Sequence, residues 1–374
     1  MELSLYQYSL CISLPLMLFF GFHMLLGHTP EKKVFSNFLL SRRLMGIALL
    51  VLAANYSVHL FYGVRFKDVN ATILMNLTTY CLTYWLFSSA LMTLLNNRYI
   101  TKMRFLRHII MWLVYALLAH LLLFLPAGSG LLTGGMIALA AWLIIYGVWL
   151  SVRLLKTYTR ATRMFKETHS DDIGAYIQWL SIFTYWAIIY GVGCGLLTFL
   201  PDKYVFLWIL SSIPFYIYLY CSYQNYILFH ERVENALTED YAAAEGHAEG
   251  PVTGIPDEDS PTYHSHIVKY IEEWIANEGF RQPGITLNDL SQQLLTNRTY
   301  LSEYINKVYH MSFRDWITDL RIEYAKRQLQ QRPEMTIQEI SDASGFLSVS
   351  HFSRTFSAKE GCSPARWRDS LQKK

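Results

Sequence analysis

The sequence predicts an all-α protein in two parts: a bundle of seven transmembrane helices, then a cytoplasmic helical domain with two helix-turn-helix units joined by a long helix. Three observations lead to this prediction. The chain of 374 residues is 52% hydrophobic and only 16% charged, which is too apolar for an ordinary soluble protein of two domains. Seven long apolar runs occupy residues 4–229. Residues 263–374 then repeat one pattern of a short helix, a tight turn and a second helix with a polar outer face.

The seven runs are each long enough to cross a bilayer. At about 1.5 Å per residue, a helix of roughly 20 residues spans a hydrocarbon layer about 30 Å thick. None of the runs contains Asp, Glu, Lys or Arg. A buried helix of a soluble protein can also be apolar all round, but seven in succession favour the membrane. The first run lacks a basic segment before it and a small-residue cleavage site after it, so we expect a helix and not a signal peptide. The expected spans are 4–27, 44–64, 71–95, 109–125, 131–152, 175–200 and 205–229.

The basic residues predict the orientation of the bundle. The loops on the carboxyl-terminal side of the membrane hold thirteen Lys and Arg, whereas the opposite loops hold three, namely Arg65, Lys67 and Lys203. Positively charged loops stay in the cytoplasm. We therefore expect the amino terminus outside and everything after residue 229 in the cytoplasm.

The composition changes abruptly after the last run. Residues 231–262 contain nine acidic residues against the single Arg232, and Gly and Pro interrupt any regular structure. We expect residues 230–262 to form an acidic linker whose first half is compatible with a continuation of the seventh helix. Pairing of two chains through this linker, as a homodimer, is the alternative to a plain spacer. The five cysteines show no CxxC spacing, so we expect no metal site.

The domain at 263–374 opens with an amphipathic helix and then shows its first helix-turn-helix unit. Thr286 is placed to cap one helix, and Asn297 is placed to cap the next. In the second unit Thr336 and Ser348 take the same two positions. Between the units, residues 313–329 form a long helix that would hold two reading helices at a fixed separation.

The stretch SFRDWITDLRIEYAKRQL, followed by TIQEISDASGFLSVSHFSRTFSAKEGCSPARWR, resembles the AraC/XylS-type DNA-binding domain of bacterial transcription regulators. The resemblance covers residues 263 to about 370. Two positions depart from the family pattern, because Leu295 and His310 stand where the family often has Gly. His tolerates a left-handed backbone better than a branched residue does. Leu295 therefore indicates an altered turn in the first unit. Eight residues of the second unit fall where the family pattern places them: Ile340, Gly345, Phe346, Phe352, Phe356, Gly361, Pro364 and Arg368.

The resemblance implies sequence-specific binding of double-stranded DNA by two helices in successive segments of the major groove, with no catalytic residues and no cofactor. Arg354 suits a bidentate contact to guanine. Glu303 suits either a contact to the amino group of cytosine or a solvated charge. Arg321, inside the connecting helix, is expected to be a structural pairing residue. The expected DNA contacts are Arg298, Thr299, Ser302, Glu303, Lys307, Val349, Ser350, His351, Ser353 and Arg354.

The spans lack acidic and basic side chains, which argues against an ion-coupled transporter. By their depth, Asn55, His59, Tyr80 and His120 would meet in the outer half of the bundle. Two interpretations remain open for these residues: ordinary hydrogen bonds between helices, or a pocket for a small-molecule or lipid signal.

The function expected from these features is that of a membrane-embedded, one-component transcription regulator in the cytoplasmic membrane of a bacterium. Its expected partners are DNA, membrane lipid, RNA polymerase, a second copy in a homodimer, and an unknown signal. Two alternatives stay open. One is a membrane transporter or enzyme with an autoregulatory DNA-binding tail. The other is a passive anchor that releases the regulator by proteolysis within residues 231–262.

Overall fold

The computed structural model describes residues 4–29, 35–96, 99–171, 177–197, 202–228, 230, 233–234 and 261–372. The chain divides into two compact units, the first made of Met1–Arg160 and Tyr176–Leu237, the second of Ala161–Ala175 and Thr238–Lys374. Within the described ranges all regular structure is helical, apart from one isolated β-bridge between His169 and Thr286. The all-α prediction is therefore confirmed at this level. Most of the expected linker at 230–262 lies outside the described residues.

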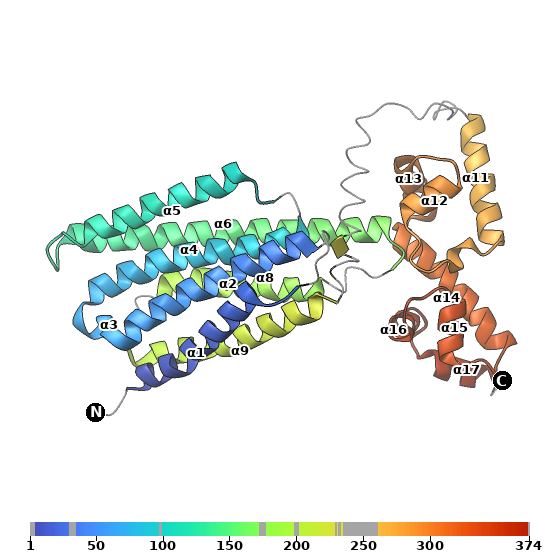
Figure 1. Cartoon of the computed structure of the whole chain (residues 1–374). Coiled ribbons are helices and arrows are strands. Elements are labelled where there is room, and N and C mark those ends of the chain that lie inside the picture. Colours follow the sequence, from blue (N-terminus) through green and yellow to red (C-terminus); the bar gives the residue numbers. More distant parts are fainter. Residues whose placement is uncertain are drawn as a thin grey trace. The chain divides into compact units, whose positions relative to one another are not determined.

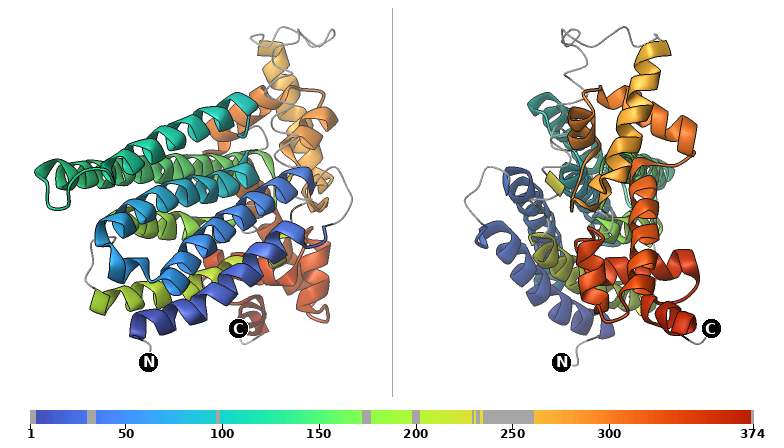
Figure 2. Two further views of the ribbon diagram at one scale, coloured as in Figure 1. Left: turned by 60° about the vertical axis from the view of Figure 1, so that its left-hand side comes forward. Right: turned by 90° about the vertical axis from the view of Figure 1, so that its right-hand side faces the viewer.

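Long helices of the first unit run side by side, and each of the seven expected ranges overlaps with one of them (Figure 1). The left view of Figure 2 shows α1, α2, α4 and α9 lengthwise again. The helix of the second expected span, α2, continues into a π-helix at Val58–Tyr62, and a short helix α3 follows at Val64–Lys67. The long helices are α1 (Leu5–Leu26), α2 (Ser36–Ser57), α4 (Val69–Leu95), α5 (Lys102–Leu122), α6 (Gly130–Thr168), α8 (Gln178–Leu197) and α9 (Asp202–Tyr226).

Five helices of the described residues are long and apolar enough to cross a membrane, namely α1, α2 with its π-helical extension, α5, α6 and α9. Neither α4 nor α8 is among these five. The count of seven spans therefore stays a prediction.

The helices extend beyond the apolar runs that predict them. The fifth span was expected at 131–152, but α6 continues without a break to Thr168. The residues that follow the apolar run are rich in Lys and Arg, which are good helix formers. A charged side chain therefore ends the apolar run, but the backbone hydrogen bonds of the helix continue past it. In the same way α2 begins at Ser36 and α5 at Lys102.

The pair α1 and α2 packs closely because two glycines face each other. A Cβ atom on Gly46 would lie 2.9 Å from the carbonyl oxygen of Gly21, closer than real Cβ contacts occur. Polar bonds add to this packing. The Ser41 hydroxyl donates to the carbonyl of Ala90 (2.7 Å) and pairs with the Tyr223 hydroxyl (2.8 Å), so it joins α2, α4 and α9.

Helix α5 carries apolar side chains that the described residues of the first unit leave about half uncovered. Leu106, Ile110, Leu113, Leu117 and Leu121 are at least half exposed. A continuous apolar surface of this kind is unfavourable in water and normal against lipid.

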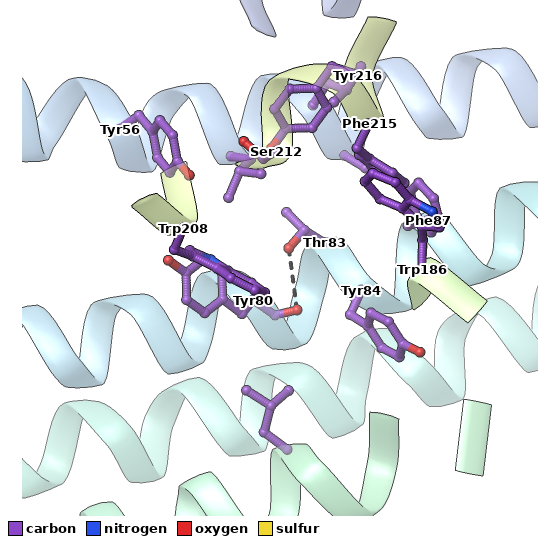
Figure 3. A pocket seen from close by; sticks show the side chains of 14 residues that line it. Tyr56, Tyr80, Thr83, Tyr84, Phe87, Trp186, Trp208, Ser212, Phe215 and Tyr216 are labelled. Atoms are coloured by element: carbon purple, nitrogen blue, oxygen red, sulfur yellow. Dashed lines mark hydrogen bonds between the residues drawn. The ribbon is translucent and has the colours of Figure 1, made fainter. Parts of the chain in front are cut away.

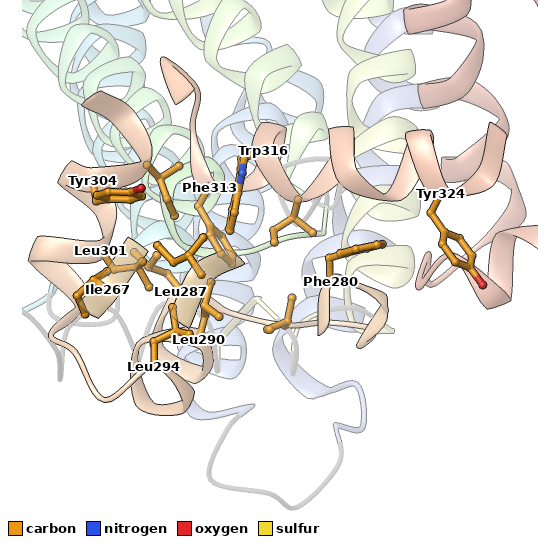
Figure 4. Packing of buried hydrophobic residues seen from close by; sticks show 14 residues of the cluster. Ile267, Phe280, Leu287, Leu290, Leu294, Leu301, Tyr304, Phe313, Trp316 and Tyr324 are labelled. Atoms are coloured by element: carbon orange, nitrogen blue, oxygen red, sulfur yellow. The ribbon is translucent and has the colours of Figure 1, made fainter. Parts of the chain in front are cut away.

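The second unit forms two small cores on either side of a long connecting helix, α14. The first core gathers around Leu290, Leu301 and Trp316 (Figure 4). The second gathers around Ile340, Phe352 and Phe356. The helices of this unit are α11 (Pro261–Ala276), α12 (Leu287–Gln293), α13 (Arg298–Tyr309), α14 (Phe313–Gln331), α15 (Ile337–Ala343), α16 (Val349–Glu360) and α17 (Pro364–Gln372).

All four caps expected from the sequence are present. Thr286 forms a capping box with Asp289 at the start of α12, and Thr336 forms one with Glu339 at the start of α15. The backbone amide of Tyr300 donates to the side chain of Asn297 (2.7 Å). Ser348 accepts from the third residue of α16. Each cap satisfies amides that the first turn of a helix leaves without partners.

Candidate nucleic-acid interface

Two helix pairs, α12 with α13 and α15 with α16, have the same turn. In the first pair the amide of Thr296 donates to the carbonyl of Ser291 (2.9 Å), and in the second Phe346 donates to Ser341 (3.1 Å). Leu295 adopts a φ of 54°, the left-handed conformation that glycine favours. The expectation of an altered first turn is therefore wrong. The turn keeps its geometry because the Leu295 side chain is 76% exposed and meets no obstacle, so only backbone strain of about 1–2 kcal/mol is incurred.

The matching position of the second turn, Gly345, has a reason to be glycine beyond its φ of 83°. A Cβ atom there would lie 2.4 Å from the carbonyl oxygen of Arg281. Arg281 in turn donates from Nε to the carbonyl of Ala343 (2.7 Å), and its guanidinium lies over the ring of Tyr324. The close approach thus packs the second pair against the segment before the first pair.

Helix α13 buries one face and leaves the other accessible. Leu301 and Ile305 point into the first core. The five residues expected to touch DNA lie outside this core: Thr299, Glu303 and Lys307 are exposed, and Arg298 and Ser302 are half-buried.

An exposed ion pair on α13 joins two of these residues. The Nζ of Lys307 lies 3.0 Å from a carboxylate oxygen of Glu303, one helical turn away. Such a pair contributes only about 0.3–0.5 kcal/mol, so either side chain can turn to another partner at little cost.

Helix α16 repeats the arrangement. Phe352 and Phe356 are fully buried. Ser350 and Arg354 are exposed, while Val349, His351 and Ser353 are half-buried. The ring of His351 packs edge-on against Phe346, with 5.6 Å between the ring centroids.

Arg321 lies in the middle of α14 with only 1% of its surface exposed. Its Nε donates to the carbonyl of Phe280 and its Nη2 to the carbonyl of Gln282, both at 2.9 Å. Its Nη1 pairs with the carboxylate of Asp171 at 3.4 Å. Burial lowers the pKa of this guanidinium and Asp171 raises it, but an arginine remains charged throughout the accessible range. The prediction of a structural pairing residue is confirmed, but its partner Asp171 could not be predicted from the sequence.

The polar residues expected to meet in the bundle separate into three places. Asn55 donates to Asn76 (3.1 Å), and Nε2 of His59 lies 2.8 Å from the same Asn76 oxygen. Tyr80 does not join them but lines a cavity elsewhere in the bundle. His120 packs edge-on against Phe124 at the end of α5.

That cavity has a volume of about 100 Å³ and lies between α2, α4, α6, α8 and α9 (Figure 3). Its wall is almost entirely aromatic and aliphatic, and its few polar groups include Thr83, Ser212 and the hydroxyls of four tyrosines. The labelled aromatic side chains are Tyr56, Tyr80, Tyr84, Phe87, Trp186, Trp208, Phe215 and Tyr216. Among the residues that the structure describes, no group of three or more His, Cys, Asp or Glu side chains gathers as a metal site would require.

Comparison with known proteins matches residues 290–370 to a helix-turn-helix domain family. The HTH-type transcriptional regulator ExsA of Pseudomonas aeruginosa is 33% identical over 99 residues, which are 26% of this chain and 31% of that protein. The uncharacterized HTH-type transcriptional regulator YobQ of Bacillus subtilis is 29% identical over 114 residues, 28% of this chain and 47% of the relative. The melibiose operon regulatory protein of Escherichia coli K12 is 29% identical over 90 residues, 24% and 30% of the two chains.

This chain therefore spans less than half the length of these relatives. No solved structure matches it significantly. The resemblance seen in the sequence is borne out for the carboxyl-terminal part: the chain carries there a helix-turn-helix domain of the AraC type, as transcription regulators do.

Proposed function

We propose that this protein is a membrane-embedded transcription regulator that reads DNA through α13 and α16. The observation that carries the proposal is the repeated helix pair, with equal caps, equal turns and polar outer faces, on a chain whose other unit exposes apolar helices. In helix-turn-helix proteins the amino-terminal part of the second helix of each pair enters the major groove.

Within this proposal Arg354 makes a bidentate contact to a guanine, and Thr299, Ser302, Ser350 and Ser353 contact base edges or phosphates. Glu303 either accepts from cytosine or stays with Lys307 as a solvated pair. Val349 and His351 pack beside the groove, and Arg298 and Lys307 bind phosphates. One connecting helix, α14, holds both reading helices.

The DNA proposal is tested by selecting duplexes from a random library with the full-length protein in detergent. Arg354→Ala should weaken binding to the selected duplex by about 1–3 kcal/mol and relax the preference at one base pair. The matched control is Arg332→Ala, an exposed arginine at the end of α14, which should change neither quantity. Equal effects of the two variants, or recovery of no common sequence, would contradict the proposal.

The membrane part of the proposal rests on the exposed apolar surface of α5 and on the basic loops. The amino terminus would face outward and the second unit the cytoplasm. Accessibility of single cysteines to an impermeant reagent in intact cells tests this: a cysteine at Val69 should be labelled from outside, and one at Lys307 only after lysis. Labelling of position 307 in intact cells would refute the orientation.

The aromatic cavity is the site at which we place signal binding. A volume of about 100 Å³ suits a ligand no larger than a single ring or a short lipid segment. Filling the cavity with Ser212→Phe should abolish the transcriptional response to conditions that induce a reporter, while DNA binding is kept. His59→Ala and His120→Ala, outside this cavity, test the remaining expected residues. An unchanged response in Ser212→Phe would rule out this cavity.

A further inference from the structure

Three residues directly after α6 lie along the chain that leads into α12. His169 pairs with Thr286 in an antiparallel β-bridge. The amide of Ser170 donates to the carbonyl of Ile285 (3.1 Å). His169, Ser170 and Asp171 are only 6%, 1% and 8% exposed, so the contact is a packed one. We call these three residues the docking segment. They belong to the same compact unit as the helix pairs.

The docking segment completes the surroundings of the buried Arg321. Two of the arginine's donors are used by the carbonyls of Phe280 and Gln282. Two further contacts go to the segment, from Nη1 to Asp171 and from Nη2 to the hydroxyl of Ser170, both at 3.4 Å. An isolated buried charge is costly, and a nearby carboxylate reduces this cost. The carboxylate of Asp171 is thus a specific partner for this site.

Arg321 also links the segment to both cores. Its guanidinium lies over the ring of Phe346, which belongs to the second core, with 5.7 Å to the ring centroid. Its partner carbonyl at Phe280 belongs to a residue of the first core. A displacement of the segment would therefore change the contacts of Arg321, which lies between the two helix pairs.

The segment lies at the amino-terminal end of α12, the first helix of the first pair. Thr286, its bridge partner, caps α12. Burial, together with the charge of Arg298 at the start of α13, lowers the pKa of His169 to about 4, while Asp289 opposes this shift. In a helix-turn-helix unit the start of the second helix approaches base edges, and the first helix crosses the DNA backbone. A segment packed at the start of α12 would lie close to the DNA backbone that this helix crosses.

We propose that residues 169–171 form a built-in latch that keeps the first helix pair from engaging DNA. The latch is a segment of this chain itself. It directly continues a candidate membrane span, because α6 runs without a break from Gly130 to Thr168. A change in α6 on signal binding would withdraw the latch and free the first pair. This inference rests on the proposed function. The contact also requires the loop and the second unit to share one side of the membrane, which agrees with the basic residues before the segment.

Cross-linking tests the contact itself. Residues opposite each other in an antiparallel pair have Cβ atoms about 4.5–5.5 Å apart, close to the span of a disulfide. In a full-length chain whose five cysteines are replaced by serine, His169→Cys with Thr286→Cys should form an intramolecular disulfide under mild oxidation. The matched control is Glu167→Cys with Thr286→Cys, which moves the cysteine two residues back. The proposal would be overturned if the 169/286 cysteine pair formed no disulfide, or formed it no more readily than the 167/286 pair.

DNA binding tests the latch. The probe is a duplex selected from a random library by the full-length protein. The oxidised His169→Cys, Thr286→Cys chain should bind it roughly tenfold more weakly than the reduced chain, because the latch cannot open. Asp171→Asn should bind roughly fivefold more tightly than the parent chain, since one charged contact is lost. Glu167→Gln, which removes an exposed carboxylate paired with Arg163, should change nothing.

Equal affinities of the oxidised and reduced chains would refute the latch even if Asp171→Asn proved unstable. Recovery of no duplex by any variant would instead refute the proposed function, and cross-linking would still decide whether the segment docks.

Discussion

Replacing Gly345 by alanine is expected to loosen the second helix pair, whereas Leu295→Ala, at the same point of the first turn, is not. The two positions share a left-handed backbone and the same hydrogen bonds. They differ in their surroundings, because a Cβ atom at 345 would meet the backbone of Arg281 at 2.4–2.9 Å. The backbone of Arg281 must move to make room.

The magnitude follows from two contributions. A left-handed non-glycine residue costs about 1–2 kcal/mol. Displacing Arg281 weakens its 2.7 Å bond to the carbonyl of Ala343, and a hydrogen bond from a charged group contributes about 1.5–3 kcal/mol. We therefore expect Gly345→Ala to lower the free energy of local opening by about 3 kcal/mol. Leu295→Ala removes a side chain that is 76% exposed and should stay within about 0.5 kcal/mol.

Hydrogen exchange of the full-length protein measures this difference at single amides. The amide of Phe346, bonded to Ser341, should exchange roughly a hundredfold faster in Gly345→Ala. The amide of Thr296, bonded to Ser291, should keep its protection in Leu295→Ala. Equal protection of Phe346 in Gly345→Ala and in the parent chain would refute the steric argument.

Three further results are expected. The docked His169, near Arg298 and Asp289, has a pKa of about 4, below its ordinary value, so the undocked form takes up a proton first. Docking should be complete above pH 6.5, and its free energy should weaken as the pH falls toward 4, by about 2 kcal/mol at pH 5. Hydrogen exchange at the Ser170 amide measures this loss. A similar loss in His169→Gln would contradict the assignment to His169. Thr286→Ala should lower the free energy of unfolding of its domain by about 1 kcal/mol in denaturant titrations, while Thr286→Ser should not. Finally, residues 263–374 carry fifteen Lys and Arg against thirteen Asp and Glu, so the salt dependence of DNA affinity should correspond to fewer than about ten phosphates.

Local features of the fold could be predicted from the sequence. The caps at Thr286, Asn297, Thr336 and Ser348 depend on bonds between residues three apart, and these follow from neighbouring side chains alone. The buried faces of α13 and α16 follow from helical spacing in the same way. The first turn could not be predicted correctly, because a pattern does not show whether space exists around Leu295.

Contacts between distant segments were beyond the sequence. Asp171 meets Arg321 across 150 residues, and no periodicity relates the two. The prediction that the polar residues of the bundle meet at one place is wrong for another reason. Counting along a helix gives the depth of a side chain in the membrane, but not the direction in which it points. Asn55 and His59 share one face because they are four residues apart, whereas Tyr80 and His120 point elsewhere.

The single helix between the two cores has a consequence for the regulatory sites that such a protein recognises. Because α14 is continuous from Phe313 to Gln331, the spacing between α13 and α16 is a fixed length. Under the proposed function, promoters bound by both helices should accumulate base substitutions more readily than insertions or deletions. Inserting one base pair between the two half-sites shifts one of them by about 3.4 Å and turns it around the duplex axis, which a rigid joint cannot follow.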